Sequence, residues 1–541
     1  MSNPEQQREH WSGNLGFVLA AAGSAIGLGN IWRFPYVTGE HGGGAFVLVF
    51  LVCVAVIGIP VMLCEISLGR HTQRNPVGAF HKLTPSSSTF AHLLGAGMIV
   101  AGLFLLVFRD WGWALICLGL GTAVFRYSWR MVGGMGVVAG FLILSFYSVV
   151  GGWTIGYVVE MLRVLFTGGA YGQEVFSDAA SSGERFVNLV VSPVWSIVNH
   201  LVFMALCTGI VYAGVRGGIE RAARVLMPLL LILLLALIVR GVSLPGAVEG
   251  IRFFLTPDFS QLGTESVLIA MGLAFFSLSL GMGAMITYGS YVERNQNLFT
   301  ASLAVVGLDV LLALLAGLAI FPAVFAVGME PTQGPGLVFV LLPTVFIGIP
   351  YGALWGLLFF VLLVVAAWTS GISLLEVVTA YFVDERGWTR PRAALTCGGI
   401  IAALGILSAV SVDADLTGWS YLGRLQRLIT WCFGAAPGSF FDLVENVSSN
   451  WLLPLGGMLI ALFVGWIWGT RQALEEIRHG SRNFGDVHVV SLLAGLKDDP
   501  SHNSPVHVLT LASVWGIFIR FISPLAVLLA FLHTIGWLFA G

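Results

Sequence analysis

Long apolar runs alternate with short polar or glycine- and proline-rich breaks along nearly the whole chain. Runs of about the length that a membrane-spanning helix needs lie at 14–38, 43–68, 90–108, 111–127, 134–166, 193–213, 224–243, 262–291, 298–327, 351–383, 393–411, 443–468 and 508–539. This pattern predicts an all-α polytopic membrane protein. The pair within 90–127 forms an extra apolar hairpin, either fully spanning or re-entrant, which we interpret as an insertion that faces lipid or a second copy.

Two of these runs carry glycines and polar residues at their centres. The first contains GFVLAAAGSAIGLGNIWRFPY (16–36) and the second contains GLAFFSLSLGMGAMITYGSY (272–291). Each glycine costs about 1 kcal/mol of helix propensity relative to alanine. Because unpaired N–H and C=O groups cannot face lipid, an unwound backbone here must line a polar cavity or contact a ligand. The two weak spans open corresponding sets of five helices, which indicates a transporter binding site between inverted repeats.

A third element, AAWTSGIS (366–373), places the hydroxyls of Thr369 and Ser370 side by side on an otherwise apolar helix. Alone, such hydroxyls usually bond back to the preceding turn, and glycines in one span usually serve close helix packing. With free carbonyl oxygens from two unwound spans, they instead form a set of hard oxygen donors. Calcium and magnesium prefer such donors, and we extend that preference to sodium.

Composition and charge narrow the class further. The chain is 57% hydrophobic and 10% charged, with a net charge of -2, so neither a soluble domain nor a nucleic-acid partner is indicated. Six scattered cysteines without a CxxC pair predict neither a metal centre nor a disulfide framework. Lysine and arginine concentrate in the loops on the side of the N-terminus, which predicts a cytoplasmic N-terminus. The first span is interpreted as retained, not as a cleaved signal.

Five segments resemble the neurotransmitter:sodium symporter family, and most closely its bacterial amino-acid transporters: REHW (8–11), GSAIGLGNIWRFPY (23–36), HGGGAF (41–46), FFSLSLGMGAMITYGSY (275–291) and TSGIS (369–373). The resemblance implies a leucine-transporter-like fold of two inverted five-helix repeats with broken first helices. The repeats would occupy 12–245, with the hairpin inserted, and 246–468. The remaining segments would be a cytoplasmic tail at 1–11 and a loop with a final helix at 469–541, in a bacterial inner membrane.

The resemblance also implies two sodium sites. The first would use the Ala25 carbonyl, the Asn30 side chain, Ser277, Asp309 and the carboxylate of the substrate; the second would use the carbonyls of Gly23, Ile26 and Ala366 with the hydroxyls of Thr369 and Ser370. Many relatives have an asparagine where this chain has Asp309. Its negative charge suggests transport without chloride, although a buried, hydrogen-bonded acid of structural use is the alternative.

Substrate contacts follow from the same likeness. The N–H groups of Leu28 and Gly29, at a half-helix start that favours an anion, and the Tyr147 hydroxyl would hold a carboxylate. An ammonium would be held by the carbonyls of Ala25, Phe276 and Ser277 with the Ser279 hydroxyl. The pocket for the substrate side chain would be lined by Ile143, Phe276, Met282, Ser370 and Leu374. Gly27 stands where amine transporters have an aspartate, so an amino acid, bulky and apolar or aromatic, is the expected substrate.

Gates carry over as well. Arg33 and Glu445 would pair above the substrate, with Tyr147 and Phe276 as a lid; Arg8 and Asp384 would close the cytoplasmic side, with Trp11 and Tyr291 at the same level. For Arg8 and Asp384 the alternative is an ordinary surface ion pair, worth at most about 1 kcal/mol. Glu65, in the middle of a span, would accept hydrogen bonds from N–H groups that the unwound helices release.

These features predict a sodium-coupled amino-acid symporter that works by alternating access. A sodium-dependent amino-acid sensor without transport is the alternative. An enzyme is not expected, because the chain has no HExxH, GxSxG or P-loop pattern. The exact amino acid, the sodium stoichiometry and the oligomeric state are left open.

Overall fold

The computed structural model describes residues 8–84, 100, 129–329, 336–412, 439–481, 511–535 and 537–538. Within these ranges the regular structure is helical, apart from one isolated β-bridge between Gly43 and Pro257. Nine helices of the described ranges are long and apolar enough to cross a membrane, and one bent pair could form a tenth. The predicted hairpin at 90–127 lies outside the described residues except for Val100, as does most of the 412–441 connection.

The first half of the chain contains two long helices, α8 and α12, and a set of shorter ones. Its elements are α1 (Asn14–Ala25), the π-helical η1 (Gly29–Arg33), α2 (Phe34–Glu40), α3 (Gly44–Cys53), η2 (Val54–Gly58), α4 (Ile59–Thr72), α5 (Pro76–Leu83), α8 (Arg130–Phe166), α9 (Ala170–Val175), α10 (Ala179–Val191), α11 (Pro193–Tyr212), η3 (Val215–Glu220) and α12 (Arg221–Val242).

The second half also combines long helices, α16 and α18 among them, with shorter ones. Its elements are α13 (Ala247–Leu255), the short η4 (Phe259–Gln261), α14 (Thr264–Ser277), α15 (Ala284–Gly289), α16 (Leu298–Ala326), η5 (Leu337–Leu341), α17 (Leu342–Ile347), α18 (Gly352–Arg386), α19 (Arg390–Ser411), α21 (Phe440–Glu445), η7 (Asn446–Leu452), α22 (Leu453–Leu462), η8 (Phe463–Gly469), α23 (Thr470–Arg478), α25 (Leu511–Ile517), η9 (Phe518–Ile522) and α26 (Ser523–Thr534).

Both spans that were predicted to be weak are broken. The chain bends by 52° between α1 and the η1–α2 segment. Between α14 and α15 it runs through Ser279, Gly281 and Gly283, whose φ angles are 52°, 82° and 76°. Left-handed backbone of this kind costs most residues about 1–2 kcal/mol but costs glycine little, so the two glycines permit the break. Ser279 adopts the same conformation despite its side chain.

Several helices extend beyond the apolar runs. The run at 351–383 lies in α18, which continues to Arg386, and the run at 443–468 lies in a helical segment from 440 to 478. Hydropathy detects only the part of a helix that crosses hydrocarbon, whereas backbone hydrogen bonding continues into the polar ends. The positions of these two runs were therefore right, and their ends were too short.

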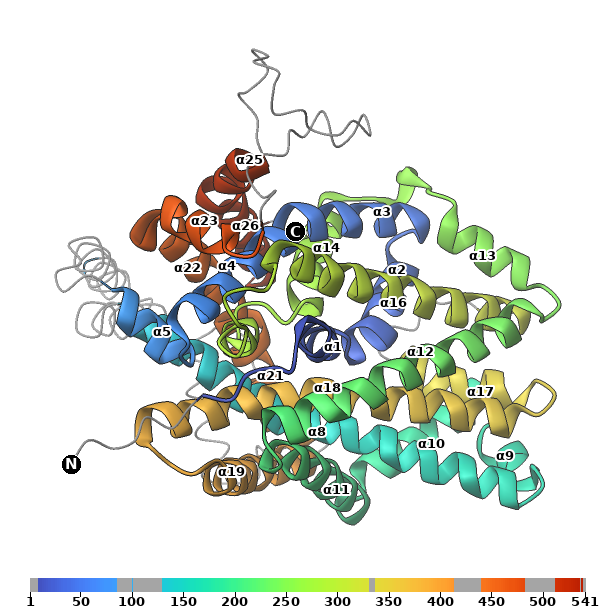
Figure 1. The fold of residues 1–541 in the computed structure, drawn as a ribbon. Coiled ribbons are helices and arrows are strands. Elements are labelled where there is room, and N and C mark those ends of the chain that lie inside the picture. The colour runs from blue at the N-terminus through green and yellow to red at the C-terminus, as the bar shows by residue number, and fades with distance from the viewer. Residues whose placement is uncertain are drawn as a thin grey trace.

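The broken helices lie inside the bundle. Figure 1 shows α8 and α18 side by side, with α1 near the centre of the molecule. Helix α1 also contacts α12 and α16. In the same view α5 and α23 lie at one end, near the start of the chain, and α9, α13 and α17 lie at the opposite end. The breaks therefore face protein rather than lipid, as the hydrogen-bonding requirement of unwound backbone demands.

Candidate functional site

One small cavity of about 30 Å³ joins the two breaks to α8 and α18. It is lined by Ser24, Ala25, Gly27, Leu28, Gly29, Ile143, Tyr147, Phe276, Ser277, Ser279, Met282, Ser370 and Leu374. Every residue that was expected to contact a substrate is in this set. Ser24 and Gly27 complete it, and both belong to the GSAIGLG segment that raised the expectation of a site. No Lys, Arg, Asp or Glu is among the lining residues.

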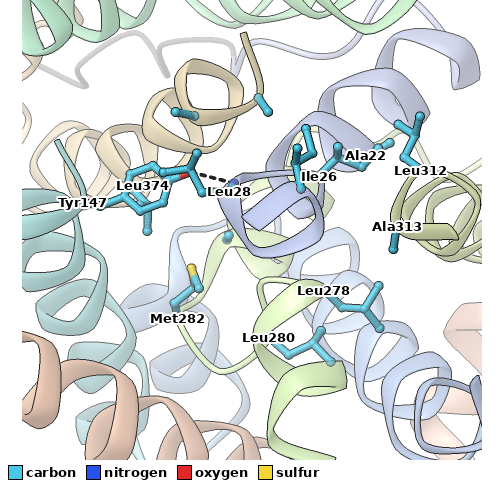
Figure 2. Close-up of a cluster of buried hydrophobic side chains, with 14 of the residues drawn as sticks. Ala22, Ile26, Leu28, Tyr147, Leu278, Leu280, Met282, Leu312, Ala313 and Leu374 are labelled. Atoms are coloured by element: carbon cyan, nitrogen blue, oxygen red, sulfur yellow. Dashed lines mark hydrogen bonds between the residues drawn. The ribbon is translucent and has the colours of Figure 1, made fainter. Parts of the chain in front are cut away.

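The end of the cavity at the start of η1 presents hydrogen-bond donors. The Leu28 N–H donates to the Tyr147 hydroxyl over 3.3 Å. Figure 2 shows Tyr147 and Leu374 close to Leu28, with Met282 below them in the view. Gly29 faces the ring of Phe276, whose Cδ1 would lie 3.6 Å from an added Cβ. N–H groups and a hydroxyl at a helix start can hold a carboxylate.

Gly27 has no room for a side chain. A Cβ there would lie 2.5 Å from the Ser370 hydroxyl oxygen and 3.1 Å from the Tyr147 hydroxyl. An aspartate, which amine transporters of the resembling family carry here, would displace both hydroxyls. The segment therefore needs glycine at this position.

The side chains expected at the first sodium site converge around Asp309, which is fully buried on α16. Asn30 Nδ2 donates to Asp309 Oδ1 over 2.8 Å and to Ser277 Oγ over 3.1 Å. Ser277 Oγ donates to Asp309 Oδ2 over 2.9 Å. Three elements thus bring an amide, a hydroxyl and a carboxylate together. The Asn30 amide presents Nδ2 to the other two groups, and its Oδ1 accepts the Gly27 N–H over 3.3 Å. The carboxylate and hydroxyl oxygens are ligands that suit a hard cation.

The residues expected at the second sodium site also lie together. Thr369 Oγ1 donates to the Ala366 carbonyl over 3.0 Å and lies 3.4 Å from the Ile26 carbonyl. Ser370 Oγ lies at the same distance from the Ile26 carbonyl. A Cβ on Gly23 would be 3.4 Å from Thr369 Cβ, which places the end of α1 against this turn of α18. These donors are all oxygens of neutral groups.

Polar side chains also tie the breaks together. Glu65, fully buried on α4, accepts the Gly281 N–H over 2.7 Å, which is the contact expected for it. The Ser279 hydroxyl was expected to accept from an ammonium; here it donates to the Ser24 carbonyl over 2.8 Å. Ser370 donates to the same carbonyl over 3.1 Å. The Ser24 carbonyl therefore joins α1, the α14–α15 break and α18.

The gate near the start of the chain is closed. Arg8 Nη1 and Asp384 Oδ2 lie 2.6 Å apart, and their side chains are 16% and 14% exposed. The pair is therefore not the exposed surface ion pair that was the alternative. Trp11 is buried; its indole N–H donates to the Tyr288 carbonyl over 3.0 Å, and its backbone N–H donates to the Tyr291 carbonyl over 3.2 Å.

Sequence reasoning missed a second layer of this gate. Tyr291 donates from its hydroxyl to Glu376 Oε1 over 2.6 Å, and Arg390 Nη1 donates to Glu376 Oε2 over 2.7 Å. Arg8 also donates to Ser290 Oγ over 2.6 Å. Glu376 was detectable, because a carboxylate inside an otherwise apolar run is costly without a partner. Arg390 follows a loop, and its partner could not be read from the sequence.

The residues expected at the outer gate line a second cavity. Arg33 and Glu445 face a vestibule of about 360 Å³ whose lining includes Leu28, Tyr147 and Phe276. The Arg33 guanidinium stacks over the Phe276 ring, 5.2 Å from the ring centre. Among the described residues, no ion pair joins Arg33 to Glu445. The expected outer pair is thus not formed, and the vestibule shares Leu28, Gly29, Tyr147 and Phe276 with the smaller cavity between the breaks.

Known proteins resemble the chain over nearly its full length. An uncharacterized sodium-dependent transporter, YhdH, of Bacillus subtilis is 35% identical over 532 residues, which are 98% of this chain and 99% of YhdH. An uncharacterized sodium-dependent transporter of Haemophilus influenzae is 32% identical over 539 residues, 99% and 100% of the two chains.

A solved structure, MhsT in complex with L-phenylalanine, matches with a TM-score of 0.73 at 40% identity and covers 97% of this chain and all of MhsT. The match agrees with the expected leucine-transporter-like fold, in which two inverted five-helix repeats begin with broken helices. The model of the sodium:neurotransmitter symporter family matches residues 8–120 and 184–427. The chain therefore belongs to the sodium:neurotransmitter symporter family, whose members couple transport to sodium.

Proposed function

We propose that the protein imports a bulky apolar or aromatic amino acid together with two sodium ions, by alternating access. The observation that carries the proposal is the cavity between the two breaks. It has hydrogen-bond donors at one end and oxygen-donor clusters on both sides. The inner gate is closed and the vestibule leads inward from the other side, which is the arrangement expected before substrate enters.

The substrate class rests on the lining of the cavity. Ile143, Phe276, Met282 and Leu374 surround the space beyond the Tyr147 hydroxyl, and methionine adapts to different apolar shapes. The structural relative MhsT carries L-phenylalanine, which supports an aromatic or large aliphatic side chain. The absence of charged residues from the lining disfavours acidic and basic amino acids, because a buried charge needs a partner.

Two sodium ions would supply sufficient driving force. Each ion that moves inward gains about 2.3 kcal/mol per 100 mV, so two ions supply about 5 kcal/mol before their concentration gradient is counted. That energy corresponds to more than a thousandfold accumulation when coupling is tight. Asp309 would provide the negative charge that the first site needs, and chloride would then not be required. The positive-inside bias supports a cytoplasmic N-terminus in a bacterial inner membrane.

Uptake by proteoliposomes tests the proposal. Radiolabelled phenylalanine, tryptophan, tyrosine and leucine would be supplied with an inward sodium gradient, or with potassium in its place, to wild type, Ser370→Ala and Ser408→Ala. Ser408 is a buried serine on α19 outside the site, so it controls for the loss of a hydroxyl. We expect sodium-dependent uptake that falls at least tenfold in Ser370→Ala only. Sodium-dependent binding without uptake by any variant would instead identify a sensor.

A further inference from the structure

Arg520 is a charged residue inside a span that the transport mechanism does not use. It lies in η9, nine residues after Leu511. At 1.5 Å per residue this separation is about 14 Å along the helix. Its Nε donates to the Gly465 carbonyl over 3.1 Å, and its guanidinium lies 4.3 Å from the centre of the Trp466 ring. The Trp466 indole N–H donates in turn to the Arg520 carbonyl over 3.2 Å. Two π-helical segments, η8 and η9, thus hold the pair.

The charge of Arg520 has no carboxylate partner among the ion pairs of the described residues. Apart from Nε, the Arg520 guanidinium has no hydrogen bond to the described residues. Its other nitrogens are nevertheless absent from the set of buried, unpaired polar atoms, so they are accessible at the molecular surface. That surface is apolar: Trp466 is 47% exposed and Phe521 is 55% exposed, with Ile517 beside them. An accessible guanidinium surrounded by lipid-facing side chains is costly unless an anion or water meets it.

The pair lies near the end of the apolar part of the helix that contains Trp466. Gly469, within one turn of Trp466, adopts a φ of 96° and ends the apolar part of the helix. The next segment, α23, begins with polar residues that include Arg471 and Glu475. Figure 1 places α23 on the same side of the molecule as α5, toward the start of the chain. Tryptophan and arginine both favour the interfacial level of a bilayer.

We propose that Arg520 and Trp466 form a binding site for the phosphate of an anionic phospholipid, in the leaflet on the side where the chain starts. The planar guanidinium can donate two parallel hydrogen bonds to phosphate oxygens. Stacking on Trp466 and the bond to Gly465 hold it in position, and the lipid tails would lie over Ile517 and Phe521. The site is separate from the substrate cavity, whose lining includes none of these residues.

Native mass spectrometry of the purified full chain with added phosphatidylglycerol tests the site. The matched control is Arg392, which also stacks on a tryptophan, with its guanidinium 4.6 Å from the Trp388 ring centre, but stands at the polar start of α19. We expect the dissociation constant for the first lipid to rise at least fivefold in Arg520→Gln and to change less than twofold in Arg392→Gln. Arg520→Lys, which keeps the charge without the planar fork, should lose two- to threefold.

Two further arms decide what the site recognises. Phosphatidylcholine should bind at least threefold more weakly than phosphatidylglycerol, and inorganic phosphate should not displace the lipid. Displacement by inorganic phosphate would show a free-anion site and overturn the lipid assignment. Equal phosphatidylglycerol binding by wild type and Arg520→Gln would overturn the proposal altogether. Should Arg520→Gln fold poorly, Trp466→Leu, which removes the stacking partner alone, must still weaken phosphatidylglycerol binding.

Discussion

Single residues near the breaks contribute in two ways. Some place polar atoms close together, and Gly27 leaves space for neighbouring side chains. Asp309, Asn30 and Ser277 place a carboxylate, an amide and a hydroxyl within hydrogen-bond distance of one another. Gly27 acts through the space that it leaves for the hydroxyls of Ser370 and Tyr147. Both effects can be tested by changing one side chain.

Replacing Asp309 with asparagine should weaken sodium binding. A unit charge about 4 Å from the ion contributes up to about 4 kcal/mol at an effective dielectric constant of 20, so the sodium concentration for half-maximal binding should rise at least tenfold. Scintillation proximity binding of labelled phenylalanine against sodium would measure the change. Ser302→Ala, a buried serine on the same helix, is the control and should leave the midpoint within twofold.

The same variant tests the expected independence from chloride. Wild-type uptake should be equal in chloride and gluconate, because Asp309 carries the negative charge itself. Asp309→Asn should become responsive to chloride. A wild-type protein that stops transporting in gluconate would contradict the role given to this carboxylate.

Alanine at Gly27 should abolish uptake while the protein still folds. The added Cβ would overlap the Ser370 hydroxyl oxygen at 2.5 Å, which disturbs the substrate cavity and the second sodium site together. Gly29→Ala is the comparison within the same segment, because its Cβ would meet only Phe276 carbons at 3.6 Å, an ordinary contact. We expect more than a tenfold loss of uptake for Gly27→Ala and a much smaller one for Gly29→Ala, at equal amounts of protein by gel filtration.

At the scale of elements, each broken helix depends on backbone groups that find partners outside the helix. The α14–α15 break is held by the bond from the Gly281 N–H to Glu65 and by the left-handed backbone of Gly281. Gly281 is also packed tightly, because an added Cβ would lie 2.3 Å from the Leu453 carbonyl oxygen. The break therefore has a fixed geometry and is not a flexible hinge at this residue.

Gly281→Ala should destabilise the protein. The left-handed conformation alone costs about 1–2 kcal/mol for alanine, and the contact with Leu453 adds to that cost. We expect a lower apparent Tm by thermofluor in detergent. Gly272→Ala lies in the same span with no atom within 4 Å of the added Cβ, and it should leave Tm unchanged or raise it because alanine is the better helix former. Equal Tm values for the two variants would contradict this account.

For the whole molecule, the Arg8–Asp384 pair is formed while Arg33 and Glu445 line a vestibule, which under the proposed mechanism is one of two alternating states. The closed gate joins segments far apart in sequence: Arg8 meets Asp384 at the end of α18, and Trp11 meets the loop after α15. Arg390 and Glu376 support it from α19 and α18. Opening toward the other side must break several of these contacts together.

Asp384→Asn should shift the molecule toward the inward-open state. It leaves the Arg8 guanidinium, which is only 16% exposed, without its carboxylate, and losing a partner of a charged group costs about 1–3 kcal/mol. The inward-open population should rise roughly tenfold, measured as a longer distance between spin labels at His10 and Arg386. Glu475→Gln breaks an exposed ion pair with Arg471 and should leave the distance distribution unchanged, since such pairs contribute little.

The sequence by itself determined the helical spans, the two breaks and nearly all residues of the cavity. These features depend on local properties: the thickness of hydrocarbon sets the length of an apolar run, and glycine and serine weaken a helix wherever they stand in it. The motif segments then assigned Asn30, Ser277, Thr369 and their neighbours to sites, and the structure brings those residues together.

Only the tertiary structure decided which distant groups meet. The pairing of Tyr291 and Arg390 with Glu376, the stack of Arg520 on Trp466 and the position of Arg33 over Phe276 depend on how helices pack and which side of the molecule is closed. An isolated run of residues carries no information about a partner that lies hundreds of positions away. Which of the two expected gate pairs is formed is therefore a property of the packed bundle rather than of any one segment.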